Sequence, residues 1–166
     1  MLAAALPKEP SLALAFNKKI KEELEKRFPP NFTVMTMNGL GHRAWAFTIN
    51  KKQMLIDDKK LGRITTECLK PFPSSKGAWN DIRQLVVYSM QRGLVPSAFE
   101  NAQSLVPDTP DTWQRIANEH DLDLTADECK LARRVLCESI TEGMKACISY
   151  DDQIDRKSTR LNSSHT

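Results

Sequence analysis

The spacing of apolar residues changes along the chain, and each spacing predicts a different kind of element. Between residues 11 and 28 apolar side chains recur every four positions, which is the period of one helical face. They are Leu12, Phe16, Ile20 and Leu24. Ser11 is a suitable N-cap and Pro29-Pro30 a suitable stop, so we expect one helix over residues 11–28.

After the two prolines the period falls to two, which is typical of strands with one buried face. The alternation covers residues 32–38, 43–50 and 53–56, with Gly39-Leu40-Gly41 and Lys51-Lys52 between them. We therefore expect a three-stranded antiparallel β-meander. The first helix is expected to cover its apolar face, because a sheet this small is not stable alone.

The second half of the chain is predicted to be helical. A break rich in proline and serine at 71–77 precedes an apolar stripe at helical spacing that reaches Met90, with Gly93 as the residue after the helix. Three more helices are expected, each from a capping pattern: Ser97 with Glu100 for a short helix to Leu105, Thr109 with Pro110, and Thr125 with Glu128.

These elements predict the α+β class: an N-terminal helix plus a three-stranded antiparallel β-meander, followed by a mostly helical half. We expect a basic unit at 1–76 and a helical unit at 77–154 that becomes acidic toward its C-terminus, compatible with one continuous domain. A composition that is 40% apolar is sufficient for a real core. No stretch approaches 18 apolar residues and no basic leader precedes the first segment, so we expect a cytoplasmic protein without a membrane partner.

Residues 155–166 are expected to be a non-native tail. From Asp155 to His165 they resemble one translated reading frame of a common sequencing-library adapter, and they show no apolar periodicity. The alternative is a polar natural C-terminus. Without Asp155, Arg156, Lys157 and Arg160, which sum to +2, the net charge falls from +3 to +1. The true C-terminus is then expected to be missing.

Charge is distributed unevenly along the rest of the chain. Residues 1–96 hold 16 Lys/Arg and 8 Asp/Glu, a net charge of +8, whereas residues 97–154 hold 5 and 12, a net charge of −7. Such asymmetry indicates a nucleic acid or another acidic partner for the basic half. The alternative, equally open at this point, is that the two halves face and neutralise each other.

The densest run of basic residues lies between residues 43 and 76, where several lysines fall at expected turns. Lysine and arginine on a β-ribbon can contact DNA phosphates and release counterions. The alternative is that these lysines only keep strand edges soluble. The candidate nucleic-acid-binding residues, with two arginines of the helical half, are Arg43, Lys51, Lys52, Lys59, Lys60, Arg63, Arg83 and Arg92.

No catalytic constellation is recognisable in the sequence. It holds no glycine-rich phosphate loop, no H-E-x-x-H and no G-x-S-x-G motif. His42 and His120 stand among polar neighbours, which is typical of surface histidines rather than of a general base. Asp57-Asp58 and Asp151-Asp152 are adjacent pairs, and adjacent side chains do not face each other. The four cysteines lack metal-binding spacing, so we assign no catalytic residue, expect no metal or cofactor, and leave enzymatic activity open.

Three segments resemble parts of phage-type tyrosine recombinases, or integrases. Residues 82–96 resemble the end of their core-binding domain, and residues 124–128 are similar to the opening of their catalytic domain. Residues 43–47, with Leu61-Gly62-Arg63 downstream, resemble their arm-binding sheet. The resemblance implies a truncated DNA-binding fragment that stops before the catalytic Arg, His and Tyr. The segment between the expected sheet and Arg92-Gly93 is too short for the family's usual helical bundle.

We therefore expect a DNA-associated protein of a mobile element or its regulation. One alternative is a protein–protein interaction module. Its basic N-terminal part would contact either an acidic protein partner or its own acidic, helical C-terminal part. Another is a truncated enzyme that lacks its active site.

Overall fold

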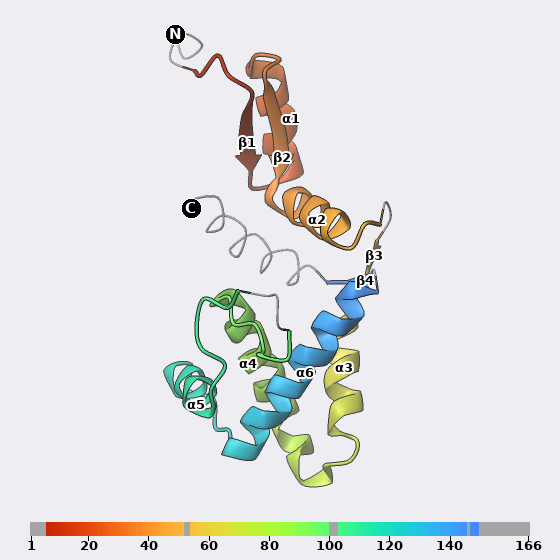
Figure 1. Cartoon of the computed structure of the whole chain (residues 1–166), viewed down its shortest axis with the longest axis vertical. Helices are drawn as coiled ribbons and strands as arrows, with labels where there is room; N and C mark the ends of the chain where they lie inside the picture. Colours follow the sequence, from red (N-terminus) through yellow and green to blue (C-terminus); the bar gives the residue numbers. More distant parts are fainter. Residues whose placement is uncertain (1–5, 52–53, 100–102, 146, 150–166) are drawn as a thin grey trace.

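The computed structural model describes residues 6–51, 54–99, 103–145 and 147–149. It contains a small α/β unit at the N-terminal end and a helical bundle formed by the following residues (Figure 1). The two parts are joined near the C-terminal end of the longest helix.

The N-terminal unit is a β–α–β arrangement followed directly by a second helix. Strands β1 (Ser11–Ala15) and β2 (Phe32–Thr36) are parallel and in register from Ser11↔Phe32 to Ala15↔Thr36. Helix α1 (Lys18–Arg27) makes the crossover between them, and α2 (Met37–Thr48) follows β2 without a loop. The unit therefore resembles a piece of a parallel α/β sheet.

The predicted antiparallel meander is wrong, because the described strands form two parallel pairs. Residues 11–15, expected in the first helix, form β1. In this segment Leu12 and Leu14 alternate with smaller residues, a period of two that the helical spacing of Leu12 and Phe16 concealed. The helix begins only after Asn17, whose Oδ1 accepts a hydrogen bond from Ile20 N at 2.9 Å.

The predicted strand at 43–50 is also wrong, since residues 37–48 form α2. The Thr36 hydroxyl caps this helix by accepting a hydrogen bond from Gly39 N at 3.0 Å. Gly41, Ala44 and Trp45, at helical spacing, are its buried residues. A local cap and a helical burial pattern therefore outweighed the apparent alternation of Trp45 and Phe47.

A second parallel pair lies where the chain passes between the two parts. β3 (Leu55–Ile56) pairs with β4 (Cys147–Ile148), and Asp57 N donates to the Ile148 carbonyl at 2.9 Å. The predicted third strand thus exists at 55–56, but its partner comes from the other end of the chain.

The helical bundle is built around α6 (Ala126–Met144), which packs against three other helices. These are α3 (Lys60–Leu69), α4 (Trp79–Gln91) and α5 (Pro110–Glu119), with a 3₁₀ helix, η2 (Pro73–Ala78), before α4. The sequence predicted α4, α5 and α6 but not α3. The bundle therefore includes residues 60–69, which precede the expected boundary at residue 76.

Most of the helix starts and ends predicted from capping patterns are found in the structure. Thr125 and Glu128 form the predicted capping box, Thr109 caps α5, and Gly93 has the positive φ of +66° expected after α4. The helix expected at 97–105 is not found in the part of that segment that the structure describes. Ser97 instead donates hydrogen bonds to the carboxylate of Asp108 from its amide and its hydroxyl.

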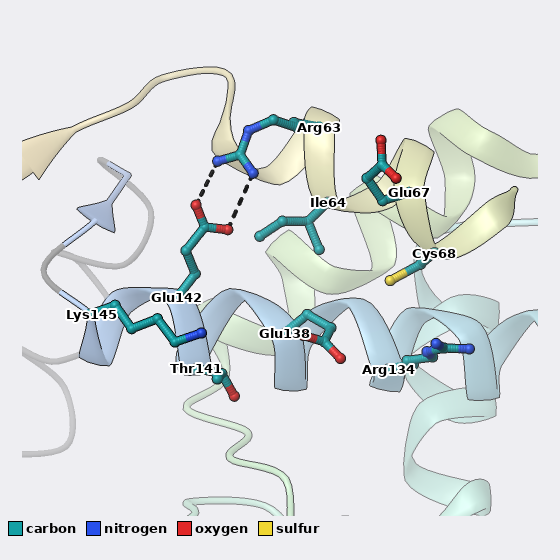
Figure 2. Close-up of a pocket in the computed structure, with 9 residues that line it drawn as sticks. All are labelled: Arg63, Ile64, Glu67, Cys68, Arg134, Glu138, Thr141, Glu142 and Lys145. Carbon is teal, nitrogen blue, oxygen red and sulfur yellow. Dashed lines mark hydrogen bonds and ion pairs between the residues drawn. The ribbon is translucent and has the colours of Figure 1, made fainter.

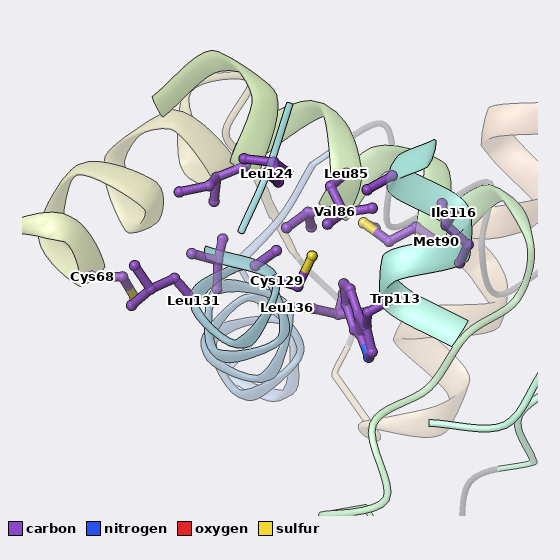
Figure 3. Packing of buried hydrophobic residues seen from close by; sticks show 14 of the residues in the cluster. Cys68, Leu85, Val86, Met90, Trp113, Ile116, Leu124, Cys129, Leu131 and Leu136 are labelled. Carbon is purple, nitrogen blue, oxygen red and sulfur yellow. The ribbon is translucent and has the colours of Figure 1, made fainter. Parts of the chain in front are cut away.

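The apolar core lies inside the bundle (Figure 3). α4 contributes Leu85 and Val86, α5 contributes Trp113 and Ile116, and α6 contributes Leu136, all of them buried. Among the described residues, no helix combines the length and apolarity needed to cross a membrane.

Candidate nucleic-acid interface

The predicted basic residues lie on several separate elements rather than on one ribbon. Arg43 is exposed on α2, Lys51 is exposed just after it, and Lys59 is exposed just before α3. Lys52 lies outside the described residues. Lys60, in contrast, is completely buried in the first turn of α3.

Arg63 is held by two carboxylates of its own chain. Its Nη2 lies 3.1 Å from an Asp57 oxygen and 2.6 Å from a Glu142 oxygen. The hydrogen bonds from Arg63 lower the pKa of both carboxyl groups. Arg63 and Glu142 are among the residues that line a groove of about 490 Å³ between α3 and α6, and their ion pair links the two helices (Figure 2).

Arg92 and Arg83 also have partners in the bundle. Arg92 forms an ion pair with Glu119 and reaches Nε2 of His120, whose ring stacks on Tyr88 with centroids 3.7 Å apart. Arg83 lies over the Trp79 ring, 5.8 Å from its centroid. Arg63 and Arg92 thus join the basic half of the sequence to acids of the other half, which neutralises that part of the charge asymmetry internally.

A different surface brings several features of a phosphate site together where β1 and β2 both end. We name it the carboxyl-end surface; it comprises residues 16–19 after β1, the last residue of β2 with the two that follow it (residues 36–38), and Arg43. Because Ala15 pairs with Thr36 in a parallel sheet, α1 and α2 start at the same edge. In open α/β sheets this edge is where ligands usually bind.

The electrostatics of this surface favour an anion. Each helix start presents backbone N–H groups and the positive end of the helix dipole. Neither α1 nor α2 has an acidic residue in its first turn, so neither helix start is neutralised by a carboxylate of its own first turn. Lys18 and Lys19 add two exposed cations at the start of α1. Nζ of Lys18 lies 3.9 Å from a carboxylate oxygen of Glu22, and both side chains are largely in solvent. An exposed pair this long contributes little, so Lys18 keeps its charge available.

Phe16 is the second unusual feature of the carboxyl-end surface. It directly follows β1 and is 89% exposed, the highest exposure among the large apolar residues of the described chain. The face of the sheet opposite α1 is also open, since Leu12 and Leu14 are 49% and 40% exposed. Arg43 lies near this face, with Nη1 3.4 Å from Sδ of Met35. An exposed aromatic ring therefore stands beside cations and helix starts.

Of the predicted residues that the structure describes, only Arg43 belongs to this surface. Sequence reasoning missed Phe16, Lys18 and Lys19 because it placed them inside one long helix. A signal was present: Asn17 and Thr36 are both good N-caps, and each follows a short apolar segment.

The described part of the chain holds no group of three or more His, Cys, Asp or Glu residues arranged for a metal ion. Its four cysteines are free thiols, and burial raises the pKa of each. Comparison with known proteins gave no match to a family model, to a curated protein or to a solved structure.

Proposed function

We propose that this protein is DNA-associated and binds a single nucleic-acid strand at the carboxyl-end surface. The observation that carries the proposal is the side-by-side start of α1 and α2, without an acid in either first turn. Two such starts offer several N–H donors to consecutive phosphates. Lys18, Lys19 and Arg43 supply the charge that releases counterions.

Phe16 is the reason to propose a single strand rather than a duplex. Aromatic side chains on single-strand binding proteins stack on unpaired bases, whereas bases inside a duplex are already stacked. A ring that is 89% exposed next to phosphate-binding groups has the position for this role. The proposal does not extend to recombinase activity, because residues 43–47, which resemble an arm-binding sheet, are helical.

The direct test is the anisotropy of a fluorescent oligodeoxythymidine titrated with the full chain at increasing salt, beside a duplex of mixed sequence. We expect tighter binding of the single strand and a loss of affinity with salt. The slope of log affinity against log salt should be about −0.7 for each phosphate contacted. Absence of binding to either probe at low salt would refute the proposal.

Matched variants locate the surface. Lys18→Ala with Lys19→Ala should weaken binding and flatten the salt dependence, because two phosphate contacts are lost. Lys26→Ala removes one positive charge at the opposite end of α1, as Lys18→Ala and Lys19→Ala each do singly at its start, and should leave affinity and salt dependence unchanged. If Lys26→Ala weakened binding as much as either single lysine variant, the contact would be nonspecific attraction rather than this surface.

The role of Phe16 has its own pair of variants. Phe16→Ala should lower single-strand affinity about tenfold, since stacking of one base contributes about 1–3 kcal/mol. Phe16→Tyr keeps an aromatic ring and should bind nearly as well as the wild type. Equal affinity of all three proteins would remove the stacking step from the proposal while leaving the phosphate contacts to the lysine test.

A further inference from the structure

Helix α2 connects the carboxyl-end surface to the bundle. Its N-terminus, after Thr36, belongs to that surface, and Trp45 lies roughly 13 Å farther along the axis, at 1.5 Å per residue. Within its own unit α2 packs against β2. The direction of α2 therefore depends on what holds its other end.

The bundle contacts the C-terminal half of α2 at a glycine, Gly143 of α6. Trp45 is 2% exposed, and a Cβ atom at Gly143 of α6 would lie 3.1 Å from Cη2 of its indole. The same position is 3.6 Å from Nζ of the buried Lys60 at the start of α3. Gly143 thus allows the indole ring to lie directly against the α6 backbone, and a larger residue would displace it.

We infer that Trp45 and Gly143 are positioning residues for nucleic-acid binding, and this inference rests on the proposed function. The contact between them sets the direction of α2, and with it the place of Arg43 and of the α2 N-terminus relative to α1. Gly143 itself lies in the bundle and belongs to no part of the carboxyl-end surface. Its effect on binding is therefore indirect and passes through α2.

The test is Gly143→Leu in the full chain, with Gly77→Leu as the matched control. A Cβ at Gly77 meets nothing within 4 Å, so the same substitution there displaces no neighbour. Leucine has a higher helix propensity than glycine, so α6 itself is not weakened.

We expect Gly143→Leu to move Trp45 toward solvent, seen as a red shift of its emission after subtraction of Trp45→Phe spectra. Single-strand affinity should fall about fivefold, within the usual range for indirect coupling. Gly77→Leu should change neither.

A double-mutant cycle separates positioning from a merely structural effect. If Gly143 acts through α2, the loss caused by Gly143→Leu should shrink in an Arg43→Ala background, because the group to be positioned is already gone. A merely structural role would lower the thermal midpoint and leave the two losses additive.

Three outcomes overturn the inference. They are an unshifted Trp45 emission in Gly143→Leu, unchanged affinity despite a shift, and additive losses in the cycle. If the wild type binds no oligonucleotide at all, the proposed function fails first. Wild-type binding with an unaffected Gly143→Leu variant refutes only the positioning role.

Discussion

The bundle and the N-terminal unit differ in how completely they bury their own apolar surface. In the bundle, α6 is surrounded by α3, α4 and α5, and the core residues at its centre are fully buried. In the N-terminal unit, α1 covers one face of the β1–β2 pair and Leu12 and Leu14 remain exposed on the other. Parallel sheets in stable folds have both faces covered. The bundle thus buries its apolar surface internally, whereas the N-terminal unit leaves one face of its sheet open.

The largest expected effect comes from cutting the bundle core. Leu136→Ala should lower the free energy of unfolding by about 3 kcal/mol, because it removes buried methyl groups and leaves a cavity. Leu14→Ala makes the same truncation on the open sheet face and should cost less than about 1 kcal/mol. Urea unfolding of the full chain, followed by circular dichroism, measures both. Similar losses of unfolding free energy in the two variants would show that the two regions bury their apolar side chains to a similar extent.

The second effect concerns the carboxylate that ties the segment before α5 to the bundle. Asp108 accepts hydrogen bonds from Nε of Arg133, Nε1 of Trp113 and the amide of Ser97, each at 2.8 Å. Burial alone would raise the pKa of Asp108, but these hydrogen bonds lower it to about 2.

This lowered pKa predicts a loss of stability in acid. A carboxyl group with a depressed folded-state pKa stabilises the fold above its unfolded pKa, and the contribution disappears as pH falls through the folded value. About 2 kcal/mol should therefore be lost between about pH 4 and about pH 2. Asp108→Asn should be less stable at neutral pH and should lose less in that window. An unchanged pH profile in this variant would contradict the assignment.

The smallest expected effect concerns a buried hydroxyl group in the bundle. The hydroxyl of Ser89 on α4 is buried and has no hydrogen-bond partner among the described residues. Ser89→Ala should raise the free energy of unfolding by up to about 1 kcal/mol, because the desolvation cost of the hydroxyl is removed. The thermal midpoint of the full chain measures this change. A clear decrease would show that the hydroxyl is satisfied after all.

The carboxyl-end surface could be predicted from the sequence only in part. Arg43 was among the expected nucleic-acid-binding residues, but so were Arg63, Arg92 and Lys60, which lie outside this surface. Whether a basic side chain is free depends on partners distant in sequence, such as Glu142 for Arg63. Phe16 differs in the opposite direction. Its spacing predicted a buried position on a helix, but it follows the strand β1 and is exposed to solvent.

By itself, the sequence determined the features that depend on neighbours within one or two turns. Thr109 and Thr125 cap their helices, Gly93 ends α4, and the apolar stripes of α4, α5 and α6 face the core, because these interactions span only a few residues. Only the tertiary structure decided the pairing of the strands. A short apolar segment becomes a helix or a strand, parallel or antiparallel, according to partners that its own residues do not specify. That pairing brings the starts of α1 and α2 to the same edge of the sheet, so it also decided where the candidate site lies.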